Sequence, residues 1–315
     1  MEFSELLSCV MQQTQAAEGL EKREGLPAWT FTDFAWYHRQ IQYLSNSMLG
    51  VFRQDGPEMF AGQYVTGTIP KKDTKAFAEG RRRHLAILEL DLFQMLAVPI
   101  PTEALAKDGS RKGKAWDAFK AEHEARLQPL GQEPIFLKQS ELAEIYGQRQ
   151  AILRDFGPLI EKPGAVESSI FWRCPVTGAY LRCRPDKVID CGDYWRVFDF
   201  KTAATTKPSK LYYHVRDFGY ANQHALYEDG LMAMDGKPVR FAFLACENTP
   251  PYNPVAFEFD PDTVAAARER NYRDIERIEW SKATGVWHHP NRDRIHTFRI
   301  RPHYFEKDLD EWRKH

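Results

Sequence analysis

One short motif constrains the possible folds of this chain more than any other feature. It is an aspartate followed two positions later by a lysine, inside a stretch of aromatic and β-branched residues. Trp-Arg-Val-Phe-Asp-Phe-Lys at residues 195–201 is typical of a β-strand. Side chains alternate along a strand, so Asp199 and Lys201 project side by side from one face. The same spacing at residues 73–75 and 235–237 falls in a polar lead-in to a helix and in a Gly-Pro turn. By itself, such a pair on a strand also fits a surface ion pair.

A second carboxylate is expected next to the first. Residues 180–184 predict a strand that pairs with residues 195–201, and Pro185 ends it just before Asp186. Asp186 would then lie at the start of a hairpin whose return strand carries Asp199. Two adjacent carboxylates repel unless a cation lies between them, and oxygen ligands suit a hard divalent ion. The hairpin therefore indicates a metal site.

A helix with a partly polar face follows this hairpin. Helical periodicity runs over residues 209–232, where Tyr220, Gln223 and Tyr227 are spaced i, i+3 and i+7 on one face. Directed at the strand end, these groups would hold a phosphate or Lys201. The alternative is a half-polar helix face without a ligand.

The pattern of expected elements indicates one α/β core with an N-terminal helical layer. There is no internal repeat and no Gly-rich strand-to-helix turn, which argues against a doubly wound dinucleotide fold. Helices are expected near residues 3–17, 45–54, 74–96, 114–127, 139–154, 209–233 and 261–282. Strands are expected near residues 168–173, 179–184, 194–201, 239–246 and 254–259, the first three as a meander.

Charge is balanced overall but unevenly distributed. Lys plus Arg number 43 and Asp plus Glu number 44, which argues against a nucleic-acid coat protein but not against an enzyme with a basic channel. Two positive stretches would follow a phosphate backbone or form solvated faces. They comprise Lys71, Lys72, Lys75, Arg81, Arg82 and Arg83, and then Lys107, Arg111, Lys112, Lys114 and Lys120.

Apolar content and cysteine usage indicate an intracellular globular chain. No long apolar run predicts a membrane span, and the N-terminus lacks the pattern of a secretory signal. The five cysteines are an odd number without the C-x-x-C spacing of zinc sites, and Cys183 alternates as a buried strand residue should. His288, His289, His296 and His303 are irregularly spaced, so a solvated tail is expected there rather than a metal site.

Together these motifs resemble the RecE-type (exodeoxyribonuclease VIII-like) branch of the PD-(D/E)xK nucleases. The likeness covers roughly residues 30 to 285, and the order of its elements makes it specific. Besides the Asp186 and Asp199–Lys201 hairpin, the matching segments are residues 37–38, 44–49, 80–84, 111–116, 167–172 and 250–252. The basic segment at 111–116 is shorter than the family pattern.

The resemblance implies a restriction-endonuclease-like fold, with a central mixed sheet flanked by helices and an N-terminal helical layer. It divides the chain into an N-terminal helix and linker at residues 1–30, a nuclease domain at residues 31–285, and a C-terminal segment at residues 286–315 packed on or trailing the core.

The resemblance also assigns roles to individual residues. The implied metal ligands are His84, Asp186, Asp199 and the backbone carbonyl of Phe200. The implied catalytic residues are Lys201, which would orient or deprotonate water, Gln223, which would position the lysine or the phosphate, and Glu167, a further acid, together with Asp186 and Asp199. The implied DNA contacts are Arg81, Lys112, Lys114, Tyr220 and Tyr227.

As function, the resemblance implies a Mg²⁺-dependent deoxyribonuclease in which Mn²⁺ substitutes. It would be a 5′→3′ exonuclease on linear double-stranded DNA ends that leaves 3′ single-stranded tails for recombination and repair. A ring-shaped homo-oligomer, a single-strand annealing protein as partner, and a cytoplasmic bacterial or phage origin are implied too. Only Cys246 follows the catalytic helix, so no iron–sulfur cluster is expected. The alternatives are an endonuclease or flap-cutting enzyme, or a non-catalytic DNA-binding module.

Overall fold

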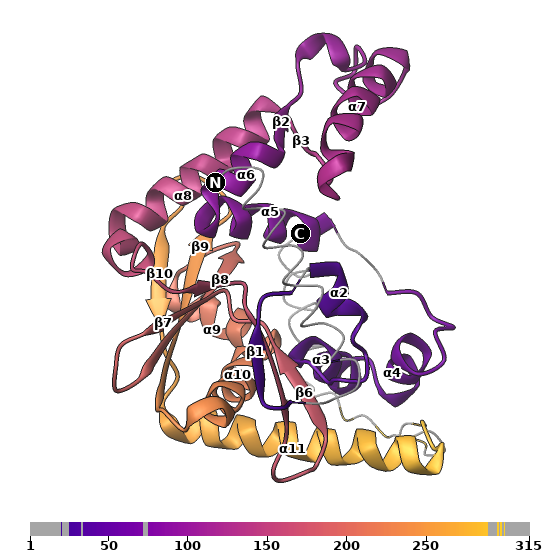
Figure 1. Ribbon diagram of the computed structural model, residues 1–315, viewed down its shortest axis with the longest axis vertical. Helices are drawn as coiled ribbons and strands as arrows, with labels where there is room; N and C mark the ends of the chain where they lie inside the picture. Colours follow the sequence, from indigo (N-terminus) through magenta and orange to yellow (C-terminus); the bar gives the residue numbers. More distant parts are fainter. Residues whose placement is uncertain are drawn as a thin grey trace, which may run out of the picture.

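Figure 1 shows the computed structural model of the 315-residue chain. The structure describes residues 25–71 apart from residue 33, residues 75–288, and single positions at 20, 295, 297 and 299. Several predictions concern residues outside this set: the helix at 3–17, Cys9, Lys72, residues 73–74, His289, His296 and His303.

A five-stranded mixed sheet forms the centre of the molecule, in the order β10-β9-β8-β7-β4. β8 runs parallel to β9, with Asp199 opposite Phe243, and antiparallel to β7. Its apolar side chains alternate between two faces, which buries both sides of the strand. The strands are β4 (Ala165–Val166), β7 (Lys187–Asp190), β8 (Trp195–Ala203), β9 (Val239–Glu247) and β10 (Pro254–Phe257).

A separate antiparallel sheet, in the order β1-β5-β6, corrects the expected meander. Residues 180–183 pair with β5 rather than with β8, and a short strand missed in the sequence, β7, is the hairpin partner of β8. Pro185 lacks the N–H that a continuing ladder needs, so the chain changes sheet there. The strands are β1 (Ala28–Thr30), β5 (Ser169–Arg173) and β6 (Tyr180–Cys183).

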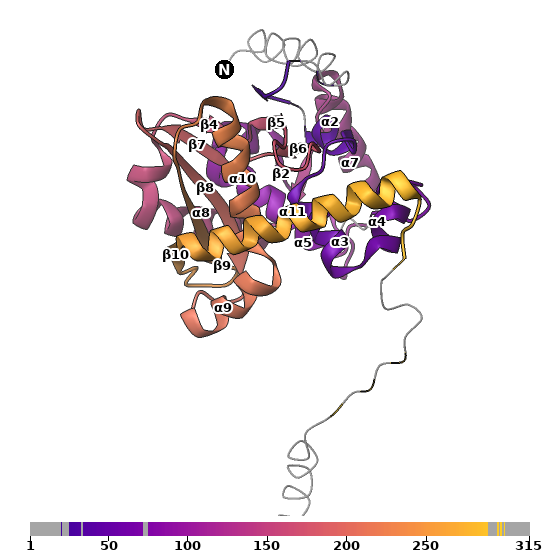
Figure 2. The ribbon, with the colours of Figure 1, turned by 90° about the horizontal axis from the view of Figure 1, so that it is seen from below.

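Helices cover both faces of the central sheet, as Figures 1 and 2 show. Phe198 and Phe200 of β8 pack towards Ile87 and Ile152 of α5 and α8, whereas Val197 packs on the side of α10 and α11. The helices of the body are α2 (Phe34–Arg39), α3 (Asn46–Gln54), α4 (Pro57–Tyr64), α5 (Lys75–Leu88), α6 (Leu90–Leu96), α8 (Gln139–Ile160), α9 (Pro208–Asp217), α10 (Tyr220–Asp235) and α11 (Pro261–Thr284).

Two features of α9 and α10 differ from or add to the sequence prediction. The single helix expected at residues 209–233 is broken at Gly219, which adopts a left-handed conformation (φ 65°) that glycine tolerates. Gly230 allows α10 to approach the small sheet closely, because an added Cβ would lie 2.8 Å from Trp172 and 3.0 Å from the Cys183 sulfur. Cys183 is buried, as its position on a strand predicted.

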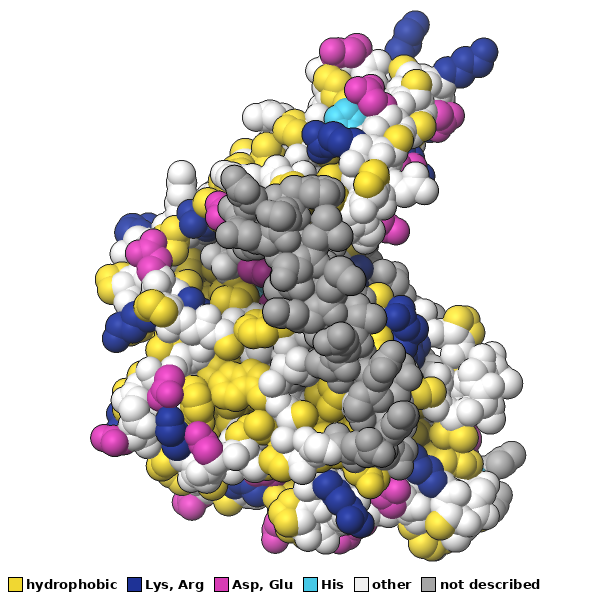
Figure 3. Space-filling model, in the orientation of Figure 1, with side chains coloured by type: hydrophobic (Ala, Val, Ile, Leu, Met, Phe, Trp, Pro, Cys, Tyr) yellow, Lys and Arg dark blue, Asp and Glu magenta, His cyan; other side chains and the backbone are white. Residues whose placement is uncertain are grey.

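A small unit projects from the body beyond α5 and α6 in Figure 1. It has its own aromatic cluster, in which Trp116 contacts Phe119 and Phe136. Basic and acidic side chains are mixed on its surface in Figure 3. Its elements are β2 (Ala97–Pro99), the 3₁₀ turn η1 (Thr102–Ala104), α7 (Lys114–Leu127), the 3₁₀ turn η2 (Gln128–Leu130) and β3 (Ile135–Leu137), with β2 parallel to β3.

The mixed α/β core with flanking helices confirms the fold class predicted from the sequence. The helices α2 and α4 and the short strands β1 to β4 were not predicted, because each is too brief for its periodicity to be recognised. Within the described residues, no helix combines the length and the apolarity that a membrane span requires.

Candidate metal and catalytic site

The site begins where the chain enters the central sheet at β7. Asp186 immediately precedes this strand, and its Oδ2 accepts a 2.6 Å hydrogen bond from the backbone N–H of Phe200. Lys187 pairs with Phe198, so Asp186 lies beside Asp199 at the same end of the hairpin. The two carboxylates are therefore adjacent, as expected, although a different strand delivers the first.

The Asp-x-Lys pair on β8 lies in the interior. The Asp199 side chain is 1% exposed and forms an ion pair with Lys201, which excludes the surface ion pair that the sequence left open. Gln223 of α10 donates from Nε2 to the other oxygen of Asp199. A lysine and an amide thus hold this carboxylate from two sides.

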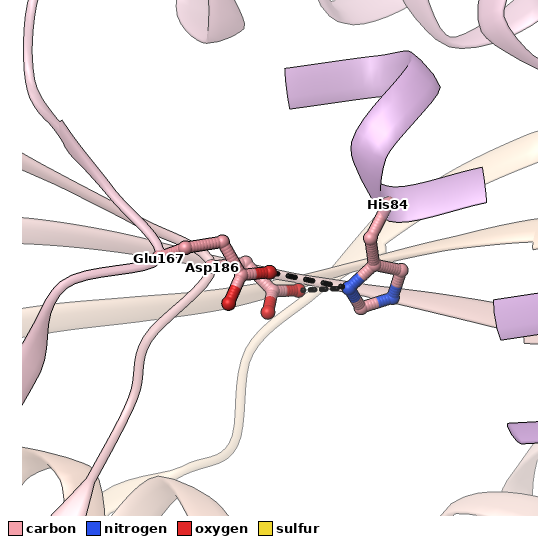
Figure 4. A group of neighbouring side chains, drawn as sticks. All are labelled: His84, Glu167 and Asp186. Atoms are coloured by element: carbon pink, nitrogen blue, oxygen red, sulfur yellow. Dashed lines mark ion pairs between the residues drawn. The ribbon is translucent and has the colours of Figure 1, made fainter. Parts of the chain in front are cut away.

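A helix brings an imidazole to the carboxylates, as Figure 4 shows. His84 of α5 lies with Nδ1 3.4 Å from Asp186 Oδ2 and 3.9 Å from Glu167 Oε1. One ligand atom from each of these three residues lies within 4.8 Å of the others, a grouping that fits a metal ion. The structure therefore brings together His84, Glu167 and Asp186 from three separate segments.

Glu167 occupies a strained backbone position between the two sheets. Its φ is 49°, a left-handed value that is uncommon for a residue other than glycine. Its N–H donates to the Asp186 carbonyl at 3.1 Å, and its Oε2 accepts from Arg184 Nε at 2.9 Å. Arg184 in turn donates to the Thr32 carbonyl at 3.0 Å. These bonds hold the Glu167 carboxylate beside Asp186, and strain of this kind is concentrated at functional sites.

Burial and charge alter the pKa values of the site. Burial and the neighbouring Asp186 carboxylate raise the pKa of Asp199 to about 7, against the lowering effect of Lys201. Burial lowers the pKa of His84, but Asp186 and Glu167 outweigh it and raise the value to about 10. Retained protons therefore offset the charge of the crowded carboxylates in this cluster, and a bound cation would have the same effect.

The donor set fits a divalent metal ion. Asp186, Glu167 and the adjacent Asp199 offer hard carboxylate oxygens, and His84 offers one imidazole nitrogen. This combination suits Mg²⁺ or Mn²⁺ better than a soft metal that prefers thiolates. PDDEXK nucleases depend on a divalent metal, in agreement with this donor set. For the Phe200 carbonyl, the structure places its own backbone N–H at the cluster, and the role of the carbonyl stays a prediction.

The two tyrosines of α10 surround Lys201 and Asp199 differently. The Tyr220 ring stacks on Phe243 and lies 5.2 Å from Lys201 Nζ. Its hydroxyl pairs with His214 Nε2 at 3.0 Å. Tyr227 is half-buried. Its pKa is raised well above the ordinary value, mainly by burial and then by the negative charge of Asp199. Of the two, Tyr220 lies next to the lysine, and Tyr227 packs against Phe241 of β9.

The basic residues expected to contact DNA are dispersed. The Arg81 guanidinium lies 5.5 Å from the Phe34 ring centroid, near the entrance to α2 and one helical turn from His84. Lys112 and Lys114 belong to the projecting unit, where Lys112 forms an exposed ion pair with Asp108 at 2.7 Å. The structure therefore brings Arg81 near the site but not these two lysines.

Sequence reasoning missed two residues of the site. Arg184 orients Glu167, and its position directly before Pro185-Asp186 was the available signal. The second residue is Glu89. Its pKa is raised mainly by burial and, to a smaller extent, by the negative charge of the nearby Glu167. No spacing rule connects Glu89 with the hairpin, because it comes from the junction of α5 and α6.

Comparison with known proteins identifies the same architecture. A crystal structure of an exonuclease candidate from Eubacterium rectale superposes with a TM-score of 0.58 at 14% identity, covering 87% of this chain and 97% of that one. An alkaline exonuclease from Laribacter hongkongensis covers 65% of this chain and 97% of its own, at 14% identity and a TM-score of 0.26. The first likeness supports the fold, and the second overlap is too loose to argue from. No curated protein matches the sequence.

The family model of a PDDEXK-like domain of unknown function (DUF3799) matches residues 45–292, which is more than half of the chain. This stretch contains His84, Glu167, Asp186, Asp199 and Lys201. The chain therefore belongs to this family of PDDEXK-like domains.

Proposed function

We propose that the protein is a divalent-metal-dependent deoxyribonuclease. The observation that carries this proposal is the convergence of Asp186, Asp199 and Lys201 with His84 and Glu167 at one end of the central sheet. Carboxylates that share a cation, with an ammonium beside them, are the arrangement that phosphodiester hydrolysis requires. A bound Mg²⁺ or Mn²⁺ would activate water and offset charge on the phosphate.

The residues of the chain supply orientation and charge. The Asp199 and Asp186 carboxylates raise the pKa of Lys201 in spite of its burial, so its ammonium stays charged and is suited to bind a phosphate oxygen. Gln223 fixes Asp199 through its amide, and Arg184 fixes Glu167. These hydrogen bonds keep the ligands in place before substrate binds.

Within this class, we favour a RecE-type 5′→3′ exonuclease acting on linear duplex ends. The sequence motifs shared with that branch, including residues 44–49 and 80–84, support this choice. On this proposal, the domain spans residues 31–285, forms a homo-oligomeric ring, and passes a 3′ single-stranded tail to an annealing protein in recombination. The protein would act in the cytoplasm of a bacterium or of a phage-infected cell.

The alternative is an endonuclease or flap-cutting enzyme with the same metal site. A non-catalytic DNA-binding module is less consistent with the site, because Asp186, Asp199 and Lys201 are all in place. A decayed site would be expected to have lost one of them.

Digestion of end-labelled linear duplex beside a closed circle of the same sequence tests the proposal. The reactions contain Mg²⁺, Mn²⁺ or EDTA, and compare wild type with Lys201→Ala. We expect metal-dependent loss of the linear DNA alone, from the 5′-labelled strand first, and no loss with the variant. Cutting of the circle would replace the exonuclease by the endonuclease, and binding without any cleavage would leave the DNA-binding module.

A further inference from the structure

A second concave region lies outside the catalytic site, between the α3–α4 connection and the C-terminal half of α11. Figure 2 shows these helices side by side. The cavity has a volume of about 440 Å³, within the roughly 300–1,000 Å³ range of ligand sites. Two carboxylates, Asp55 and Asp274, line it. We call it the arginine groove after four other lining residues, Arg53, Arg270, Arg273 and Arg277.

One of the four arginines is fixed by neighbours, and three are available for a ligand. Arg53 donates to Asp274 at 2.7 Å and to Asn271 at 3.0 Å. The other three are exposed, and among the described residues their guanidinium groups form no ion pair or hydrogen bond. Of these, Arg277 lies over the Phe52 ring at 5.6 Å. The groove thus carries more positive charge than its two carboxylates neutralise.

Like charges are held close together in this groove. Burial lowers the pKa of Arg53, Asp274 opposes that effect, and the nearby Arg270 lowers the pKa further. Arg270, Arg273 and Arg277 are spaced i, i+3 and i+7, so they follow one face of α11 over about 10 Å. A row of guanidinium groups at this spacing is suited to successive phosphates, which accept bidentate hydrogen bonds from arginine.

The groove is connected to the catalytic site through α10. Asn222 donates to the side-chain oxygen of Asn271 at 3.2 Å, and Asn271 also accepts from Arg53. The next residue of α10, Gln223, donates to Asp199. One helix therefore supports both regions.

An exposed aromatic ring adjoins the groove. Gln54, which lines the groove, donates to the Asp217 carbonyl at 3.1 Å, and the following residue is Phe218. Phe218 is 63% exposed, although a phenylalanine ring would normally be buried. Its neighbours on α9, Tyr212 and Tyr213, are 64% and 56% exposed. Aromatic faces beside a basic track are the features with which proteins bind unpaired bases.

We propose that the arginine groove and Phe218 bind a single-stranded DNA segment outside the catalytic site. Arg270, Arg273 and Arg277 contact its phosphates, and Phe218 stacks on an unpaired base. This inference rests on the proposed nuclease function for the identity of the strand, which would be the one that the enzyme leaves intact. A duplex would offer phosphates to the arginines but no exposed base face to Phe218.

Fluorescence anisotropy with a labelled 20-nucleotide strand, and separately with its duplex, tests this proposal in EDTA. The variant is Arg270→Gln/Arg273→Gln, and the matched control is Arg126→Gln/Lys162→Gln, which removes two exposed positive charges elsewhere. We expect the groove variant to weaken single-strand binding at least tenfold. The slope of log K against log salt should become shallower by about 1.4, for two phosphate contacts at about 0.7 each.

A second variant tests stacking. Phe218→Ala should weaken single-strand binding about fivefold or more, because a base–aromatic stack contributes on the order of 1–3 kcal/mol, while duplex binding stays within twofold. Unchanged single-strand binding in the groove variant, or an equal loss in the control, would overturn the proposal. A loss confined to duplex would overturn the single-strand assignment.

The test separates this inference from the proposed function. Binding is measured without metal, so it does not depend on cleavage. A protein that digests no DNA but loses single-strand binding with the groove variant would overturn the nuclease proposal and retain the groove. If the protein digests DNA but the groove variant binds single strands as well as wild type does, the nuclease proposal is retained and the groove proposal is overturned.

Discussion

The proposed catalytic cluster and the arginine groove differ in whether their charged side chains have partners. In the cluster, each charged group is buried or half-buried against a partner: Lys201 with Asp199, His84 with Asp186, and Arg184 with Glu167. In the groove, three arginines are exposed and form no ion pair with any residue that the structure describes. Compensated, preorganised charge suits bond cleavage, because it costs no rearrangement during the reaction. Uncompensated exposed charge suits reversible binding of a polyanion.

The largest expected effect is the loss of cleavage activity when Lys201 of the cluster is replaced. Lys201→Ala should lower the cleavage rate by at least about 10²–10³-fold, since it removes a positioned charge next to the phosphate. Affinity for single-stranded DNA should change by less than about twofold, because the groove proposed to bind it is intact. Initial rates on labelled linear duplex and anisotropy measure the two quantities. Lys162→Ala serves as the control, and wild-type cleavage by Lys201→Ala would remove the cluster from catalysis.

The proposed role of His84 of α5 as a metal ligand is tested by metal preference. Wild type should use Mn²⁺ at least as well as Mg²⁺, because imidazole suits Mn²⁺ better than the harder ion. His84→Ala should lower Mn²⁺ affinity on the order of tenfold or more and remove this preference. Activity titrations with each metal measure it, with His123→Ala of the projecting unit as control. An unchanged Mn²⁺ to Mg²⁺ ratio in His84→Ala would contradict a ligand role.

A smaller effect is expected for a residue that acts through another. Arg184→Gln removes the charged donor that holds Glu167 at 2.9 Å, so metal affinity should fall about tenfold. Saturating metal should restore much of the rate, since Arg184 is a positioning residue rather than a ligand. Rate against metal concentration measures this, with Arg173→Gln in β5 as control. Loss of rate that metal does not rescue would instead indicate direct contact with substrate.

The two regions also differ in how far the sequence predicts them. Asp186, Asp199, Lys201 and Gln223 lie within 38 positions of each other, so strand alternation and helix spacing were enough to bring them together. The partner of β8 was nevertheless wrong, because Pro185 sends the chain to another sheet and the four-residue β7 was too short to recognise.

The arginine groove could not be read from the sequence. Its arginines come from α3 and from α11, more than 200 residues apart, and only tertiary packing brings these helices together. Neither segment belongs to the basic stretches that composition singles out. Conversely, Lys112 and Lys114 form a dense basic segment but belong to a projecting unit with mixed charge. Local charge density in the sequence therefore gives no sign of this groove, and the DNA contacts of Lys112 and Lys114 stay a prediction.

The smallest effect concerns stability, and it follows from the protons that the metal-free cluster retains. The folded-state pKa of Asp199 is raised to about 7, so its contribution is full below its ordinary value of 3.8 and is lost as pH rises through 7. The pKa of His84, raised to about 10, gives a contribution that is full below 6.5 and lost as pH rises through 10. Both signs agree, so the contribution of the cluster to stability in EDTA should fall between pH 5 and pH 9. Burial lowers the pKa of His38 and of His224 to about 4, so these two histidines add stability as pH rises to 6.5 and offset part of the decline.

Thermal unfolding in EDTA should therefore show a Tm several degrees lower at pH 9 than at pH 5, on the scale of about 2–4 °C per kcal/mol for a chain of this size. Asp199→Asn should flatten the part of this decline below pH 7, because an amide carries no proton to lose. Saturating Mn²⁺ should raise Tm more at pH 9 than at pH 5, since the ion replaces the retained protons. The groove variant should keep the wild-type pH dependence, because its arginines stay charged over this range. If Tm declines with pH in Asp199→Asn as it does in wild type, the titrating group lies outside the cluster. The pH dependence would then no longer distinguish the cluster from the arginine groove.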